Sequence, residues 1–450
     1  MSDDSRLMCE IVDLIHDGRG VGRPGGKTCF IQGALPGETV EFRRHNQKRN
    51  YDEAHVLEIL SASDSRIQPQ CKHFPRCGGC TVQHLEHGAQ VSFKEKQLLD
   101  SLERSGMQPK TLLPALSGPQ WAYRRRARLA VQRAKDGNVL VGFHNPGSRR
   151  IEPITECHVL AEPLAAMVVA LPEWLTAFPP GIRLFEVELL SADNGLAIAV
   201  EASRAPSATE LEQMLASMKM FTTSSAQLWW KASNQSKFAR LDTGGEPLEL
   251  ALTDDVQLQV QPGQFVQVNG EINRQMIDQV LSLVRKPQKD TDSSDKTGSS
   301  KIGSGKKSLA VDLFCGSGNF SLPLAAHFDR VIGIEGLEEL VRSAEANARR
   351  NNLTNIEFMV SDLNDWSGMR KLKEKIDLVL LDPPRNGAAG AMPWIAKAKP
   401  KQIIYISCHP STMVRDAKLL TEAGYSLSAA GVMDMFPHTA HVEAIALFEK

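Results

Sequence analysis

The chain lacks the features that mark membrane and secreted proteins. Its longest apolar runs are short and interrupted by charged residues, which excludes a transmembrane helix of about 20 apolar residues. Residues 1–5 are polar and acidic, whereas a signal peptide needs a basic start followed by an apolar stretch. We therefore expect a cytoplasmic protein that has no membrane partner.

A positive net charge, which would mark an obvious nucleic-acid-binding protein, is also missing, because the formal net charge is -1. The distribution of charge is more informative than the total. Residues 18–51 hold seven Lys and Arg against two acids, and residues 121–150 hold eight against one. Phosphate binding needs local positive charge, so these stretches allow RNA binding. They are also compatible with solvated basic surfaces that are balanced elsewhere.

The eight cysteines do not indicate a disulfide framework in a cytoplasmic chain of 450 residues. Three of them form the pattern Cys71-x5-Cys77-Gly78-Gly79-Cys80, and 76 residues separate Cys80 from Cys157. Four thiolates with such spacing bind either zinc or an iron–sulfur cluster, and the spacing alone slightly favours zinc. The C-x3-C-x2-C pattern of radical adenosylmethionine enzymes is absent.

The length of the chain predicts two to four domains. In the N-terminal part, short apolar stretches alternate with turns rich in Gly and Pro, which predicts a small β-barrel. Residues 66–262 contain helix-like segments at 93–105 and near 210–220, and strand-like segments predominate, so we expect a mixed α/β domain with a largely antiparallel sheet. Those strand-like segments are 128–132, 139–143, 184–190, 196–200 and 228–231.

Residues 263–450 begin with a predicted helix at 276–284 and then alternate strands with helices from residue 308 onward. This alternation predicts a mainly parallel, doubly wound sheet that binds its ligands at the carboxyl ends of its strands. The predicted strands are 309–314, 330–335, 356–360, 376–381 and 402–407, with helices at 319–326 and 337–351. Residues 287–307 hold a single aliphatic residue and are predicted to be a disordered insertion.

The first strand of this part runs into a glycine-rich turn, Phe314-Cys315-Gly316-Ser317-Gly318-Asn319. Glycines let a ligand approach the backbone closely, and the spacing differs from the G-x-G-x-x-G of dinucleotide sites, so it favours S-adenosylmethionine. Glu335 ends the next strand and can hold ribose hydroxyls, and Asp362 ends the following one and can accept from the adenine amino group. Taken singly, either acid would more often be a solvated strand-end residue.

Two further strand ends carry chemically useful residues. Asp382 begins an Asp-Pro-Pro-Arg segment, where it could bind a flipped base or the methionine end of the donor. Cys408 ends a later strand, and Glu443 precedes the last apolar stretch. A thiolate that adds to carbon 6 of a pyrimidine activates carbon 5 for methylation, provided that a base lies nearby. Taken alone, Cys408 would be read as a buried small residue and Glu443 as a surface acid.

Together these motifs resemble the RNA uracil-C5 methyltransferase family, and the resemblance covers nearly the whole chain. It rests on D-L-F-C-G-S-G-N-F, L-D-P-P-R, Y-I-S-C-H-P, D-M-F-P-H-T-A-H-V-E and the earlier F-V-Q-V-N. The insertion at 287–307 is longer than this family leads us to expect. The resemblance implies that Cys408 is the nucleophile and Glu443 the proton acceptor. It also implies a donor pocket lined by Gln267, Phe314, Asn319, Glu335, Asp362 and Asp382.

The resemblance extends to the first half of the chain. Residues 1–65 resemble a TRAM domain, an OB-like barrel found on RNA-modifying enzymes. The cysteine pattern resembles the family branch that carries a [4Fe-4S] cluster and methylates 23S ribosomal RNA, whereas the transfer-RNA branch lacks both features. The implied cluster ligands are Cys71, Cys77, Cys80 and Cys157, and the cluster would organise a surface that contacts RNA.

The sequence therefore predicts an α/β protein with three parts. These are an RNA-binding barrel (1–65), a central mixed α/β iron–sulfur domain (66–262) and a class I, Rossmann-like methyltransferase domain (263–450). The implied function is methylation of carbon 5 of one uridine in 23S ribosomal RNA through a covalent adduct, by a monomer without an obligate protein partner. The alternatives are a transfer-RNA uracil methyltransferase and a non-catalytic iron–sulfur RNA-binding protein.

Overall fold

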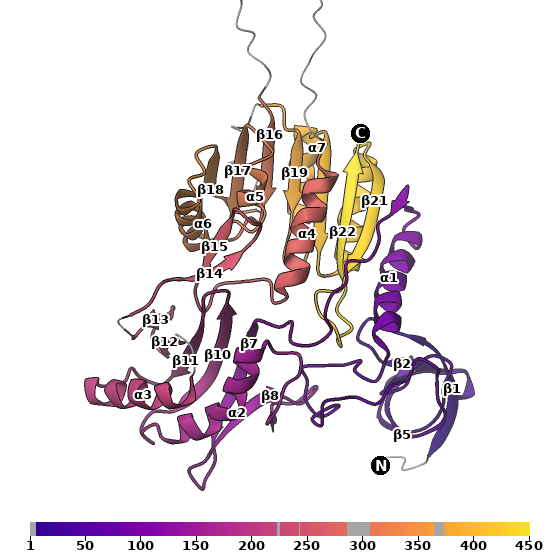
Figure 1. Ribbon diagram of the computed structural model, residues 1–450. Helices are drawn as coiled ribbons and strands as arrows, with labels where there is room; N and C mark the ends of the chain where they lie inside the picture. The colour runs from indigo at the N-terminus through magenta and orange to yellow at the C-terminus, as the bar shows by residue number, and fades with distance from the viewer. Residues whose placement is uncertain (1–5, 223–225, 243, 286–306, 364–371, 373) are drawn as a thin grey trace, which may run out of the picture.

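The fold is built around three β-sheets that occupy different parts of the molecule (Figure 1). The predicted insertion at 287–307 lies outside the described residues, apart from Lys307. None of the helices in the described part is long and apolar enough to cross a membrane. The computed structural model describes residues 6–222, 226–242, 244–285, 307–363, 372 and 374–450.

The N-terminal sheet closes into a five-stranded barrel in the order β1-β2-β3-β5-β4, which confirms the predicted barrel. Ile11, Ile31 and Phe42 fill its interior. Strand β2 was not predicted, because its glycines resemble a turn. A side chain on Gly22 would collide with the Cys9 sulfur, so glycine is required there by close packing. The strands are β1 (Leu7–Leu14), β2 (Gly20–Gly22), β3 (Thr28–Gln32), β4 (Thr39–Gln47) and β5 (Tyr51–Ser61), and a short 3-10 turn, η1 (Pro24–Gly26), follows β2.

Helix α1 (His87–Glu103) connects the barrel to the C-terminal sheet and runs beside its edge in Figure 1. It begins six residues before the predicted start, since the Glu86 carboxylate accepts a hydrogen bond from the Ala89 N–H and caps the helix. Strand β6 (Thr111–Leu112) then pairs in parallel with the outer strand of that sheet. Residues 87–112 thus pack on the C-terminal sheet, although they precede the central one in sequence.

The central sheet has seven strands in the order β13-β12-β11-β10-β7-β8-β9. Every neighbouring pair is antiparallel except β11 and β12, as expected for a largely antiparallel sheet. Helix α3 (Ala208–Phe221) was predicted, whereas α2 (Glu162–Thr176) was not. The strands are β7 (Arg126–Arg133), β8 (Val139–His144), β9 (Ile151–Pro153), β10 (Leu184–Ala192), β11 (Gly195–Ala202), β12 (Ala226–Ala232) and β13 (Ala239–Arg240).

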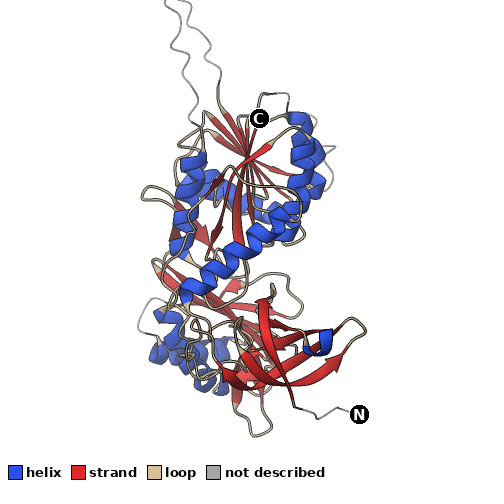
Figure 2. Ribbon diagram, turned by 90° about the vertical axis from the view of Figure 1, so that its right-hand side faces the viewer, coloured by secondary structure: helices blue, strands red, loops and turns tan. Residues whose placement is uncertain are grey.

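The C-terminal sheet has eight strands in the order β18-β17-β16-β19-β20-β22-β21-β6, and helices cover both of its faces (Figure 2). The five strands from β18 to β20 are parallel, which confirms the predicted doubly wound sheet, and β22 runs antiparallel to both neighbours. The strands are β16 (Leu309–Leu313), β17 (Arg330–Glu335), β18 (Ile356–Val360), β19 (Leu378–Leu381), β20 (Gln402–Ser407), β21 (Ser426–Met433) and β22 (Glu443–Glu449).

The two faces of this sheet form separate apolar cores. One core joins the sheet to α4, α5 and α6, and the other joins it to α1, α7 and α8. Helix α4 starts six residues before the predicted helix because Asn269 caps it, and α5 is shorter than predicted. The helices are α4 (Gly270–Leu283), α5 (Ser321–Leu324), α6 (Glu338–Arg350), α7 (Met392–Ala398) and α8 (Pro410–Glu422), with a hairpin of β14 (Leu248–Ala251) and β15 (Gln257–Val260) and the 3-10 turn η3 (Ala389–Ala391).

Candidate active site

Three neighbouring strands bring Asp382, Cys408 and Glu443 to one edge of the C-terminal sheet. Asp382 follows β19 and Cys408 follows β20, and these two strands are adjacent and parallel. Strand β22 runs the other way, and its Ala444 pairs with Ser407. The first residue of β22, Glu443, therefore lies at the same level as Cys408. The predicted nucleophile and the predicted base, 35 positions apart in sequence, therefore lie side by side at this edge of the sheet.

Burial and mutual repulsion govern the protonation of these groups. Glu443 is 4% exposed, and burial, reinforced by the charge of Asp382, raises its pKa well above the ordinary value. Burial likewise raises the pKa of Asp382 to about 7. The pKa of the Cys408 thiol rises from 9.0 to about 11, first through burial and then through the charges of Glu443 and Asp382. Near pH 7 the free protein thus holds a neutral thiol, and the carboxyls beside it ionise only at a higher pH than is usual for such groups.

Arg385 supplies positive charge near Cys408 and Glu443. It opposes the upward pKa shifts of Cys408 and Glu443, and its Nη2 lies 3.4 Å from Nδ1 of His441. Burial, followed by the charge of Arg385, lowers the pKa of His441 to about 4, so this histidine is neutral near pH 7. Neither residue was predicted as a site residue. Both residues belong to motifs that the sequence analysis had noted, Asp-Pro-Pro-Arg and His-Val-Glu, and this membership could have indicated that they lie at the site.

The predicted donor residues Gln267, Phe314, Asn319 and Asp382 line one cavity of about 90 Å³ at the ends of β16 and β19. Strand order reverses between these strands, which is where doubly wound sheets bind ligands. Nε2 of Gln267 donates to Oδ2 of Asp382 at 3.5 Å. The amides of Asn319 and Asn273 exchange two hydrogen bonds of 3.0 Å. Asn273 was not predicted, because it lies within a helix and outside the motifs.

The glycine-rich turn has a left-handed backbone at Phe314, Gly316 and Gly318, with φ of 63°, 55° and 104°. Glycine adopts such angles at low cost, but a phenylalanine rarely does, and strained residues of this kind cluster at functional sites. The turn directs the Gly316 N–H to Oε2 of Glu335 at 3.2 Å. The predicted ligand-binding turn is thus tied to the end of the next strand.

The other two predicted donor residues, Glu335 and Asp362, do not line this cavity. Glu335 is partly buried at the end of β17, and its two oxygens accept from the N–H groups of Gly316 and Leu337. Each oxygen keeps a second lone pair for another donor. Asp362 is exposed and follows β18, whose Val360 pairs with Glu335. The two acids thus occupy neighbouring strand ends beyond the enclosed part of the pocket.

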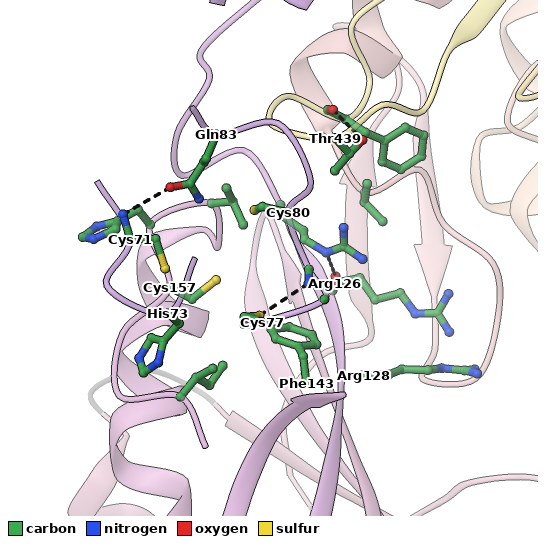
Figure 3. A pocket seen from close by; sticks show the side chains of 18 of the residues that line it. Cys71, His73, Cys77, Cys80, Gln83, Arg126, Arg128, Phe143, Cys157 and Thr439 are labelled. Carbon is green, nitrogen blue, oxygen red and sulfur yellow. Dashed lines mark hydrogen bonds between the residues drawn. The ribbon is translucent and has the colours of Figure 1, made fainter. Parts of the chain in front are cut away.

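The predicted cluster ligands, Cys71, Cys77, Cys80 and Cys157, line a second cavity, of about 770 Å³, and Figure 3 shows their side chains gathered there. Burial raises the pKa of Cys80 to about 12 and that of Cys157 to about 11. The Gly79 N–H donates to the sulfur of Cys77 at 3.4 Å. Among the described residues, no three His, Cys, Asp or Glu side chains are arranged to hold a single metal ion.

The same cavity extends toward the sheet edge that carries Asp382, Cys408 and Glu443, since Arg385 and His441 also line it, as does Arg124. Two other arginines of the basic stretch, Arg126 and Arg128, bind the buried carboxylate of Glu188 at 2.8 and 2.9 Å. This one carboxylate offsets one of the two positive charges, so the pair provides less phosphate-binding potential than the count of basic residues suggested.

This doubly wound fold and its strand-end site define a Rossmann-like methyltransferase. The family model described as tRNA (Uracil-5-)-methyltransferase matches residues 297–450. A Stenotrophomonas maltophilia protein named 23S rRNA (uracil(1939)-C(5))-methyltransferase RlmD is 37% identical over 463 residues, which cover 100% of this chain and 98% of the relative. Its namesake from Aeromonas hydrophila is 37% identical, with coverages of 99% and 96%. The chain belongs to the RNA uracil-C5 methyltransferase family.

A solved structure shares nearly the whole fold. It is the Pyrococcus abyssi tRNA (uracil-54, C5)-methyltransferase in complex with S-adenosyl-L-homocysteine, with a TM-score of 0.73 and 24% sequence identity. The match covers 98% of this chain and 99% of that one, so it includes the N-terminal barrel. The barrel by itself therefore does not distinguish a ribosomal-RNA enzyme from a transfer-RNA enzyme.

Proposed function

We propose that the chain methylates carbon 5 of a uridine in 23S ribosomal RNA, with S-adenosylmethionine as the methyl donor. The substrate follows from full-length relatives whose names specify uridine 1939 of that RNA. The observation that carries the chemistry is the meeting of Cys408, Glu443 and Asp382 at adjacent strand ends, next to the donor cavity. The target base would approach this edge of the sheet flipped out of its stack.

Cys408 begins the reaction as a thiolate that forms a bond to carbon 6 of the uracil and pushes an electron pair onto the ring carbonyl. Carbon 5 of the resulting enolate attacks the sulfonium methyl group, and the broken S–CH3 bond leaves S-adenosylhomocysteine. Glu443 then accepts the proton from carbon 5. The released electron pair restores the double bond between carbons 5 and 6, the C6–S bond breaks, and Cys408 leaves as a thiolate.

These reaction steps need Cys408 and Glu443 in their ionised forms, which the free protein disfavours and the bound ligands favour. The high pKa values of Cys408 and Glu443 arise from burial and from neighbouring negative charge. The sulfonium carries a positive charge and would lie close to Asp382, so its arrival favours the ionised forms of all three groups. Arg385 acts in the same direction. The nucleophile is thereby activated when both substrates are in place.

The donor would lie along the ends of β16, β17 and β18. Gln267, Phe314, Asn319 and Asp382 would surround its sulfonium and amino-acid end, because they line the enclosed cavity. Glu335 would hold the ribose hydroxyls with its free lone pairs, and Asp362 the adenine amino group. The related Pyrococcus abyssi enzyme contains S-adenosyl-L-homocysteine, the product form of this donor.

Cys71, Cys77, Cys80 and Cys157 are the residues that would hold a [4Fe-4S] cluster. All four thiols line one cavity, and Gly78 is needed where the loop passes close to the His144 carbonyl, since a Cβ there would lie 2.5 Å from that oxygen. Four cysteine thiolates are the ligand set that such a cluster requires. When bound, the cluster would cross-link two chain segments beside the site where the RNA would bind.

The test is transfer of labelled methyl groups from S-adenosylmethionine to purified 23S ribosomal RNA, with transfer RNA as the competing acceptor. We expect label in 23S RNA with the native chain and none with Cys408→Ala. Transfer that survives the substitution would show that the covalent mechanism is wrong. Preferential labelling of transfer RNA would instead assign the chain to the substrate of the Pyrococcus abyssi relative.

A further inference from the structure

Arg125 lies directly before the central sheet and lines the proposed donor cavity at the C-terminal sheet. It precedes β7, yet it lines the cavity that also contains Gln267, Asn273 and Asn319. Its side chain is only 17% exposed. The sequence motifs attach no role to it beyond membership of a basic stretch, and its neighbours Arg126 and Arg128 are bound to Glu188.

The backbone holds Arg125 in place from two sides. Its N–H donates to the Val268 carbonyl and its carbonyl accepts from the Ser191 N–H, both at 2.8 Å. Its guanidinium occupies the space where a side chain on Gly270, the first residue of α4, would lie, so a larger residue there would displace it. Arg125 is therefore placed against the positive end of the α4 dipole, one turn from Asn273.

The charge of Arg125 is poorly compensated within the described part of the chain. Its one ion pair there is a long contact of 3.8 Å to Asp193, whose side chain is 49% exposed. The described residues provide its guanidinium with no hydrogen bond to another side chain, although this group has five N–H donors. Burial lowers its pKa, and the nearby Arg274 lowers it further. A buried, weakly paired arginine at a ligand cavity is suited to bind an anion.

The methyl donor carries a single anionic group, the carboxylate of its methionine end, beside a cationic sulfonium and an ammonium. If the donor lies as proposed above, its adenosine faces Glu335 and Asp362, outside the enclosed cavity, and its amino-acid end faces Arg125. The polar groups of Asn273, Ser317 and Asn319 line the same end. We propose that Arg125 binds the carboxylate of the donor, an inference that rests on the proposed function.

The test compares two ligands that differ only in the carboxylate, namely S-adenosylhomocysteine and its decarboxylated analogue. Calorimetry on the native chain should show a preference of about 10- to 100-fold for S-adenosylhomocysteine, as expected for charge-assisted hydrogen bonds. Arg125→Met should weaken S-adenosylhomocysteine by that factor and leave the analogue within about twofold. Arg125→Lys should keep part of the preference. Arg274→Met, an exposed cation near Arg125 that does not line the cavity, is the matched control and should change neither affinity.

The remaining outcomes overturn the proposal. Equal weakening of both ligands by Arg125→Met would show that Arg125 only supports the fold of the pocket. Unchanged ligand affinities together with a raised KM for RNA would make Arg125 a phosphate contact instead. Failure of the native chain to bind S-adenosylhomocysteine would show that the cavity is not a donor site. This result would contradict the proposed function as well as the role of Arg125.

Discussion

Substitution of Glu443 by glutamine should make Cys408 more reactive in the free protein while it stops turnover. The negative charge of Glu443 is the second cause, after burial, of the raised pKa of the Cys408 thiol. Glutamine has nearly the same shape but no charge, so the thiolate becomes easier to form. Without a base, however, the proton on carbon 5 cannot be removed, and the methylated adduct should stay attached to Cys408.

The size of the effect follows from the pKa of about 11, compared with the ordinary 9.0. At pH 9 this shift reduces the thiolate fraction from about one half to about 1%. Burial remains in the variant, so we expect the thiol pKa to fall by about one unit rather than two. The alkylation rate at pH 9 should therefore rise about 5- to 10-fold, because the thiolate is the reactive form.

The assay is alkylation by iodoacetamide from pH 7 to 10, with the modification of Cys408 followed by mass spectrometry. Arg385→Met should shift the rate in the opposite direction, since its positive charge favours the thiolate. Glu449→Gln, at the far end of the same strand, is the matched control and should have no effect. An unchanged or slower alkylation in Glu443→Gln, or continued turnover, would refute the placement and role assigned to Glu443.

Three other predictions test the site, the fold and the metal. Asp382→Asn should raise the free energy of unfolding of the ligand-free chain at pH 8 by roughly 2–4 kcal/mol. The pKa of Asp382 in the folded protein is about 7, above the ordinary 3.8. Its ionised form therefore destabilises the fold above pH 7, whereas the protonated form below about pH 4 has no such cost. Chemical denaturation at both pH values checks this, and a gain that persists at pH 4 would contradict it. Lys94→Met should lower the free energy of unfolding by roughly 3–5 kcal/mol, because the buried carboxylate of Asp434 then keeps only His87 of its two ionic partners, and a double variant with Asp434→Asn should recover part of the loss. Cys80→Ser should lower the iron content of the purified protein and its affinity for 23S RNA, and iron analysis that shows no metal in either protein would contradict the cluster.

Short-range patterns were sufficient to select four residues that line one cavity and two acids at neighbouring strand ends, which together form the proposed donor site. The glycine-rich turn, the alternation of strands and helices and the strand-end acids all depend on residues that are close in sequence. The backbone requirements of a turn and the periodicity of buried side chains are local properties, so they are legible without the fold. The spacing of Cys71, Cys77 and Cys80 is of the same kind. Helix starts were misplaced where a single capping residue, Glu86 or Asn269, decided the boundary.

The tertiary structure decided how distant segments meet. Strand β22 enters the sheet antiparallel beside β20, and only this register brings Glu443 to Cys408. The pairing of Arg126 and Arg128 with the one carboxylate of Glu188 reduces the positive charge that the sequence had suggested for RNA binding. The sequence motifs gave no sign that Arg125, which precedes the central sheet, lines the cavity at the C-terminal sheet. The local spacing of residues thus determined which chemical groups the protein carries, whereas long-range packing, which depends on burial across the whole chain, decided which of them act together.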